Sequence, residues 1–124
     1  MTESQIQSAI RLRLGGRPDV RLFRNHVGMV RDESGRTHTF GLMRGSADLI
    51  GWVTISGVAV FLSVEVKSAT GKTRPEQTAW AAAVNKMGGI AFIARSPEDA
   101  EQQLDDNIRR LHQIQEQDSK GRRL

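Results

Sequence analysis

Three charged side chains in the middle of the sequence could act together. The dipeptide Ser56-Gly57 lies between two apolar segments and predicts the turn of a β-hairpin. With that turn, Asp48 lies opposite Glu65, and directly opposed side chains share one face of a sheet with Cβ atoms about 5 Å apart. Lys67 follows Glu65 by two positions, so it projects from the same face. The two acids repel each other there unless a proton or a cation compensates them.

Binding of a hard metal ion is the chemistry that this set favours. A Glu-x-Lys pair alone is typical of a solvated ion pair, but Asp48 adds a second acid in apolar surroundings. Mg²⁺ prefers oxygen ligands and binds through one or two carboxylates. The three histidines, His26, His38 and His112, are scattered, and cysteine is absent. The sequence therefore indicates a carboxylate site and excludes a thiolate zinc site or a cysteine nucleophile.

The acid–acid–lysine set resembles the PD-(D/E)xK nuclease signature, and its flanks resemble those of VRR-NUC domains. The segments that carry the resemblance are Glu3 with Gln7, Arg24-Asn25, Phe40-Gly41-Leu42, Gly45-Ser46-Ala47-Asp48, Glu65-Val66-Lys67-Ser68, Gly71-Lys72, Pro75-Glu76-Gln77 and Gly88-Gly89-Ile90-Ala91-Phe92. Their order over about residues 2–100 is similar to that of a stand-alone VRR-NUC domain of phage or bacterial type. One position departs from the family pattern, because Ala47 stands where proline usually precedes the acid and restricts the turn.

The resemblance implies an α/β fold with a restriction-endonuclease-like core, in which helices flank a mixed β-sheet. It also implies a metal-dependent DNA endonuclease that uses Mg²⁺ or Mn²⁺ to hydrolyse phosphodiester bonds. The substrate would be branched DNA such as a Holliday junction. A homodimer suits that substrate, because two cuts in a symmetric junction need two related active sites.

The resemblance also assigns roles to the residues of the signature. Asp48 and Glu65 would bind the metal together with the backbone carbonyl of Val66. Lys67 would orient the attacking water and stabilise the charge that develops on the phosphate.

Two further residues carry roles that compete with simpler explanations. Glu3 would hold a metal-bound water or a second ion, but an acid in the first turn of a helix is also favourable to the helix dipole. Gln77 would orient Lys67 or a phosphate, but it could equally be a polar residue of a first helical turn.

Basic residues point to a polyanionic partner. The chain has 18 Lys and Arg against 14 acids, and solubility alone could explain this excess. Arginine favours bidentate contacts with phosphate, so the arginine-rich segment 11–44 predicts contacts with the DNA backbone. The residues expected to bind DNA are Arg24, Asn25, Arg44, Lys72 and Arg74.

Hydrophobic periodicity and turn residues predict the elements that position these groups. We expect a helix from the capping box Thr2–Gln5 to Gly15, a strand over 20–27, a hairpin over 29–40, strands over 48–55 and 58–67, a helix from Pro75 to about Gly88, a strand over 90–94 and a last helix from Pro97 to about Gln117. The first five strands are expected to form a mostly antiparallel meander. A helical crossover then makes segments 58–67 and 90–94 parallel neighbours.

Further predictions concern the core and the ends of the chain. The apolar residues of the second helix, Trp80, Ala83, Val84 and Met87, are expected in the core. A chain of 124 residues predicts a single nuclease domain over 1–117, with a basic tail over 118–124. No apolar run approaches about 18 residues, and the N-terminus is polar, so a cytoplasmic protein without a membrane partner is expected. Two alternatives stay open: a nucleic-acid-binding module that lacks cleavage, and a structural phage component.

Overall fold

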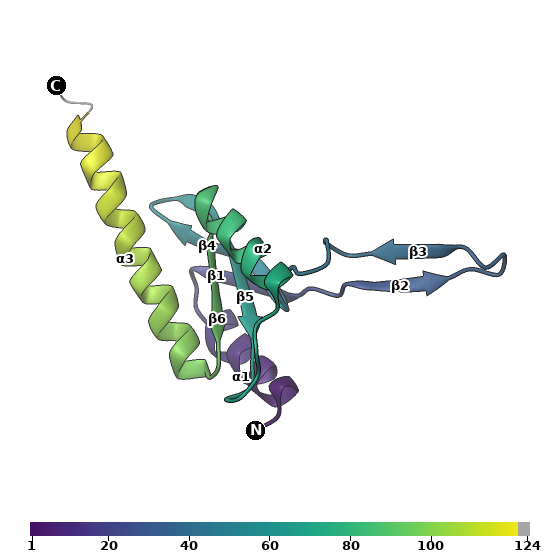
Figure 1. Cartoon of the computed structure of the whole chain (residues 1–124). Coiled ribbons are helices and arrows are strands. Elements are labelled where there is room, and N and C mark those ends of the chain that lie inside the picture. Colours follow the sequence, from purple (N-terminus) through teal and green to yellow (C-terminus); the bar gives the residue numbers. More distant parts are fainter. Residues whose placement is uncertain (122–124) are drawn as a thin grey trace.

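The computed structural model describes residues 1–121 and contains a mixed sheet with three helices and a separate β-hairpin (Figure 1). The elements in chain order are α1 (Glu3–Gly15), β1 (Val20–Arg24), β2 (Gly28–Arg31), β3 (Thr37–Phe40), β4 (Leu49–Ile55), β5 (Val58–Val66), α2 (Pro75–Lys86), β6 (Ile90–Ala94) and α3 (Pro97–Gly121). This order confirms the predicted sequence of helices and strands.

The sheet has the strand order β1-β4-β5-β6. The β1–β4 and β4–β5 pairs are antiparallel, whereas β5 and β6 are parallel. Helix α2 connects β5 to β6, which confirms the predicted crossover. The sheet is therefore mixed, and the architecture is that of a restriction-endonuclease-like core.

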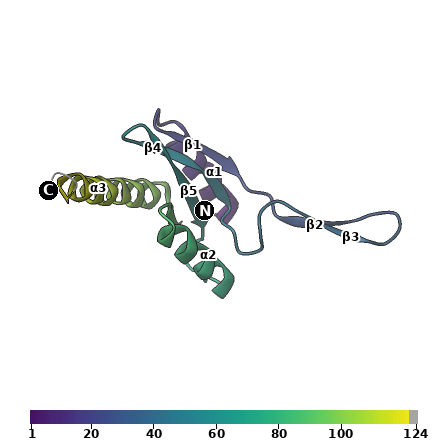
Figure 2. The same ribbon diagram turned by 90° about the horizontal axis from the view of Figure 1, so that it is seen from above.

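The expected five-stranded meander is wrong, because β2 and β3 do not join this sheet. They pair only with each other and form an arm that projects away from the rest of the molecule (Figure 2). The backbone N–H of Asn25 donates to the carbonyl of Asp48, which continues the β1–β4 pairing by one residue beyond β1, and within residues 1–121 no strand pairs with the other edge of β1. Neither strand of the arm has a buried side chain to hold it against the sheet.

One face of the sheet carries the hydrophobic core. Helices α1 and α3 pack on this face, and their buried side chains include Ile6, Ile10, Leu14, Ala100 and Leu104. The predicted apolar face of α1 is thereby confirmed, as is its capping box between Thr2 and Gln5. The sheet contributes alternate residues to this core, which are Val20, Leu22, Leu49, Val53, Ile55, Leu62, Val64, Val66, Ile90, Phe92 and Ala94.

Helix α2 lies against the opposite face, over β5 and β6. The indole N–H of Trp80 donates to the hydroxyl of Ser63 at 2.9 Å, and the Trp80 ring meets Phe61 edge-on with ring centroids 6.4 Å apart. The expectation that this helix contributes core residues is wrong for Ala83 and Met87, which are exposed, while Trp80 and Val84 are partly buried. Within residues 1–121, no element covers the outer side of α2, so Ala83 and Met87 on that side face solvent.

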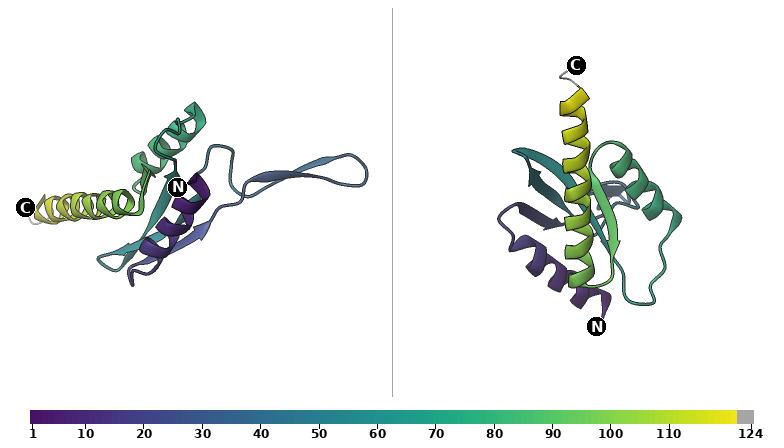
Figure 3. Two further views of the ribbon diagram at one scale, coloured as in Figure 1. Left: turned by 90° about the horizontal axis from the view of Figure 1, so that it is seen from below. Right: turned by 90° about the vertical axis from the view of Figure 1, so that its left-hand side faces the viewer.

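The last helix is longer than predicted. Helix α3 continues to Gly121 rather than fading near Gln117, so most of the expected basic tail is helical, and residues 122–124 lie outside the described part. Figure 3 shows the outer half of α3 extending past the sheet. Within residues 1–121, no helix combines the length and apolar character needed to span a bilayer.

Candidate active site

The β4–β5 hairpin brings the two predicted acids to one end of the sheet. Its register pairs Leu49 with Val64 and Ile55 with Val58, as the turn at residues 56–57 predicts. Asp48 immediately precedes β4, and its carboxylate accepts a hydrogen bond of 2.8 Å from the backbone N–H of Val66. The Asp48 side chain therefore lies directly beside the end of β5 that carries Glu65.

Alternation along β5 places Glu65 on the α2 face of the sheet. Val64 and Val66 point into the core, so Glu65 points to the opposite face, and continued alternation directs Lys67 there as well. Both are nearly inaccessible, with 7% of Glu65 and 6% of Lys67 exposed. The backbone N–H of Lys67 donates to the carbonyl of Ala94, which extends the pairing with β6 and holds the lysine in place. Acids and lysines are rarely buried to this extent unless they are paired.

The Glu65 carboxyl is strongly perturbed. Its pKa is raised from 4.5 to about 8, first by burial, then by a hydrogen bond to Asp48 that favours the protonated form, and by repulsion from the Asp48 charge. The positive charge of Lys67 lowers this pKa, and repulsion from Glu3 raises it slightly. In the absence of a cation, Glu65 therefore keeps a proton near neutral pH.

The donor set at this position fits a divalent cation. Two carboxylates lie together, and one of them keeps a proton because the pair cannot hold two uncompensated negative charges. A cation that prefers oxygen ligands would replace that proton. Within residues 1–121, no group of three or more His, Cys, Asp or Glu side chains is arranged to hold a metal ion. The set is thus two carboxylates, and the predicted contributions of Glu3 and of the Val66 carbonyl stay predictions.

Asn25 holds the loop that leads into Asp48. Its side-chain amide donates to the Ser46 hydroxyl and to the Ala47 carbonyl, each at 2.8 Å, and its backbone N–H donates to the Asp48 carbonyl. These three contacts fix the turn at Ala47, which lacks the restriction that a proline would impose there. Asn25 was predicted to bind DNA, and the structure assigns it a positioning contact in addition.

The start of α2 forms the other wall of the site. The side-chain amide oxygen Oε1 of Gln77 accepts a hydrogen bond of 3.0 Å from the Arg74 backbone N–H, as a capping residue does. The amide nitrogen of Gln77 can therefore donate to a phosphate oxygen, whereas a contact with the Lys67 ammonium group, which only donates, would need the second lone pair of the same amide oxygen. The guanidinium groups of Arg44 and Arg74 lie 3.8 and 3.9 Å from the Glu76 carboxylate, so two predicted DNA-binding arginines meet at this wall.

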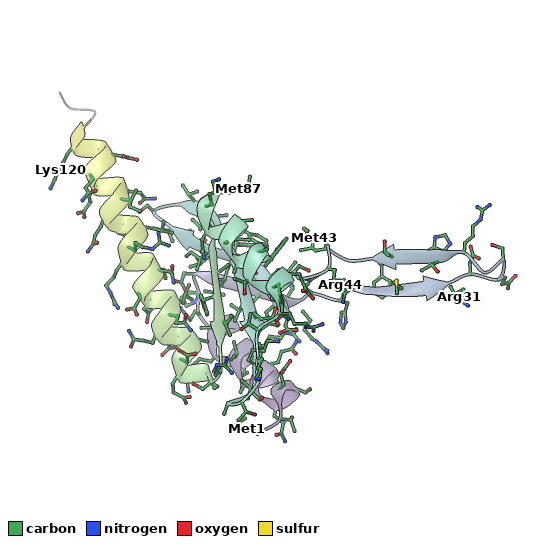
Figure 4. The ribbon with its side chains drawn as sticks, in the orientation of Figure 1. Met1, Arg31, Met43, Arg44, Met87 and Lys120 are labelled. Carbon is green, nitrogen blue, oxygen red and sulfur yellow. The ribbon has the colours of Figure 1, made fainter. Side chains whose placement is uncertain are left out.

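Six of the predicted residues line one cleft of about 250 Å³: Asn25, Arg44, Asp48, Glu65, Arg74 and Gln77. Figure 4 shows Arg44 at the point where the β2–β3 arm meets the body of the protein. The cleft has carboxylates at its base and arginines at its rim, which suits a phosphate group that approaches a bound cation.

Arg24 and Lys72 lie elsewhere. The Arg24 side chain lines a separate small cavity together with Gln7 and Arg11 from α1. Lys72 is exposed on the loop between β5 and α2. The structure therefore does not bring these two cations into the cleft, and their contacts with DNA stay predictions.

Arg95 was not recognised from the sequence. Its guanidinium group donates hydrogen bonds to the carbonyls of Ser68 and Gly71 at 2.6 and 2.8 Å. These two hydrogen bonds stabilise the loop that follows Lys67. A single arginine after a short strand carries no local signal of this role. The role arises because β6 runs parallel to β5 and ends beside the same loop.

The comparison with known families agrees with this geometry. The family profile described as the VRR-NUC domain matches residues 36–98, which include Asp48, Glu65, Lys67 and Gln77 and amount to half of the chain. Searches of curated proteins and of solved structures gave no match.

Proposed function

Because the chain belongs to the VRR-NUC family of nuclease domains, we propose that it is an Mg²⁺- or Mn²⁺-dependent DNA endonuclease that cuts branched DNA. The observation that carries this proposal is the pair of carboxylates, partly buried Asp48 and buried Glu65, in an arginine-rimmed cleft, with the buried Lys67 two residues after Glu65 on the same strand end. A structural ion pair would need one acid for one lysine, whereas this site holds a second acid and keeps it protonated.

Asp48 and Glu65 would hold the cation, which when bound supplies charge neutralisation at the scissile phosphate and lowers the pKa of water. Glu65 releases its proton as the cation binds. The Lys67 ammonium group has three hydrogen-bond donors, and it would orient the attacking water and stabilise negative charge on a phosphate oxygen. Arg44 and Arg74 would contact neighbouring phosphates from the rim of the cleft.

Catalysis also requires that the Asp48 carboxylate and Lys67 be held in fixed positions. The hydrogen bond from the Val66 N–H fixes the Asp48 carboxylate, and the pairing of Lys67 with Ala94 fixes the strand end. A site held on strands places its reacting groups within a narrow range, which supports hydrolysis rather than simple electrostatic binding of DNA.

The preference for branched DNA rests on symmetry. A four-way junction has two equivalent positions for cleavage, and a two-fold homodimer presents two equivalent active sites. We therefore extend the proposal to a homodimeric, structure-selective enzyme whose preferred substrate is a four-way junction.

Cleavage of labelled DNA tests the proposal. A four-way junction and a linear duplex of matched sequence are incubated with the protein in Mg²⁺, in Mn²⁺ and in EDTA. We expect cleavage with either metal, none in EDTA, and loss of cleavage with retained DNA binding in Asp48→Asn and Glu65→Gln. Glu116→Gln is the matched control, because Glu116 is an exposed acid on α3.

Three results would contradict the proposal at different levels. Cleavage by Glu65→Gln at the rate of the control would refute the site, whereas DNA binding without cleavage under every metal would leave a binding module. Equal cleavage of junction and duplex would remove the branched substrate and keep the nuclease. Junction preference should persist as salt rises, because geometry rather than charge supplies it.

A further inference from the structure

We infer that the β2–β3 arm and the apolar groove along α2 form a homodimer interface, in which the arm of each copy packs into the groove of the other. The inference rests on the homodimer of the proposed function and names the surface that makes it. The surface comprises two parts, the arm (residues 27–43) and the groove between α2 and β5.

The arm exposes more apolar side chains than an unpartnered surface element usually does. Its apolar side chains are 39–71% exposed, and they are Val27, Met29, Val30, Phe40, Leu42 and Met43. Four residue pairs join β2 to β3, and an isolated two-stranded hairpin is marginal in water. A projecting hairpin with this many exposed apolar groups is therefore expected to be buried against another surface.

Charge argues that this other surface is protein rather than DNA. Within residues 27–43 the two arginines, Arg31 and Arg36, are balanced by Asp32 and Glu33. The Asp32 carboxylate is further engaged by the His38 ring at 2.7 Å. A β-ribbon that binds in a groove of DNA needs a net positive charge, which this arm lacks.

The groove offers a matching apolar surface on the same chain. It encloses about 440 Å³ and is lined mainly by Phe61, Trp80, Ala83, Val84 and Met87, with Met43 from the base of the same chain's arm at one end. Figure 4 shows Met43 at one end of α2 and Met87 at the other. The 12 residues of α2 span roughly 18 Å, and seven residues from the base of the arm toward its tip reach roughly 23 Å. The arm and the groove are thus similar in length.

The arm cannot fill the groove of its own chain without rebuilding its base. Gly41 has a φ of +82°, and a Cβ there would lie 2.0 Å from the His26 carbonyl oxygen. Gly45 has a φ of +93°, and a Cβ there would lie 2.6 Å from the Glu76 carbonyl oxygen. These close backbone contacts fix the arm in the outward direction seen in Figure 1, so the arm does not fill the groove of its own chain, and we assign the groove to the arm of a second copy.

The exposed area is sufficient for a stable dimer. The six apolar residues of the arm together with Phe61 and Met87 are 39–87% exposed. At roughly 200 Å² for a fully exposed large side chain, they present on the order of 900 Å² per copy. A standard interface buries about 800 Å² per partner. Each copy carries both an arm and a groove. A two-fold axis therefore places each arm in the groove of the other copy.

The oligomeric state without DNA or metal tests this inference separately from cleavage. Sedimentation velocity of the full chain is expected to show a dimer at micromolar concentration. Val30→Glu in the arm and Met87→Glu in the groove should each weaken dimerisation at least tenfold. Leu12→Glu is the control, because Leu12 is 81% exposed on α1, outside both surfaces.

Cross-linking tests the geometry, since the chain contains no cysteine of its own. A Val30→Cys chain is mixed with a differently tagged Ala83→Cys chain and treated with a flexible bismaleimide. We expect a cross-linked heterodimer, and none when Leu12→Cys replaces Val30→Cys. Cross-linking of Val30→Cys only to itself would overturn packing of the arm in the groove. A monomeric wild-type chain that still cuts DNA would overturn the dimer and leave the nuclease intact.

Discussion

Raising the pH should destabilise the metal-free protein through one residue, Glu65. In the unfolded chain this carboxyl ionises near its ordinary pKa of 4.5, whereas burial and the neighbouring Asp48 raise its pKa in the folded protein to about 8. Between these values the folded state binds a proton that the unfolded state has lost. The free energy of unfolding therefore falls as the pH rises through this window.

The size of the effect follows from the shift in pKa. A change from 4.5 to about 8, at about 1.4 kcal/mol per pKa unit, amounts to an upper bound of roughly 5 kcal/mol in the free energy of unfolding. For a domain of this size, 1 kcal/mol corresponds to about 4 °C in Tm. The metal-free protein should consequently lose on the order of 10–20 °C in Tm between acidic pH and about pH 8.

Thermal unfolding followed by circular dichroism in EDTA measures this loss, with Glu65→Gln as the reference variant. Glutamine has nearly the same shape and does not titrate, so the other ionisable groups contribute equally to both proteins. The difference in Tm should grow in favour of Glu65→Gln as the pH rises. Saturating Mg²⁺ should restore the wild-type Tm at high pH and leave the variant little changed. Parallel curves for the two proteins would refute the raised pKa and the burial that causes it.

Three further outcomes are expected. Lys67→Ala should lower the cleavage rate by about 10²–10³-fold with little change in metal affinity measured by calorimetry, because a protonated lysine cannot ligate a metal; a loss of metal affinity as large as that of Asp48→Asn would show a structural role. Asn25→Ala removes two hydrogen bonds that hold the loop before Asp48, so it should cost about 1–2 kcal/mol in a denaturant titration and reduce cleavage more than DNA binding; unchanged cleavage would contradict the positioning role. DNA affinity should fall with salt, and Arg44→Ala and Arg74→Ala should each reduce the log–log slope by about 0.9, which an unaltered slope would disprove.

The site could be predicted from the sequence because a short turn determines its register. Ser56 and Gly57 adopt φ values of 51° and 79°, as a two-residue hairpin loop requires. Once the loop is known, the alternation of side chains assigns every residue of β4 and β5 to a face. The juxtaposition of Asp48 and Glu65 then follows from counting, and the face of Lys67 follows from its distance to Glu65.

The same reasoning could not predict that the arm stays outside the sheet, because strand pairing between distant segments has no local signal in the sequence. Residues 28–40 have the pattern of a hairpin, and that hairpin is present. Whether it joins the sheet depends on pairing with β1, whose one neighbour in the described sheet is β4, from twenty-odd residues away, and the hairpin stays off the other edge. The expectation that α2 contributes Ala83 and Met87 to the core failed for a related reason. An apolar helical face predicts that the face is buried, but it does not identify the surface that buries it.

The electrostatics of the site also depend on packing that the sequence does not reveal. Spacing places two acids and a lysine on one face, but a solvated face would leave Glu65 near its ordinary pKa. Parallel pairing with β6 covers the strand end through the contact between Lys67 and Ala94, and α2 covers the same face from above. Burial is the largest cause of the raised pKa of Glu65, so it is these distant elements, and not the spacing alone, that let the Glu65 carboxyl keep its proton near neutral pH.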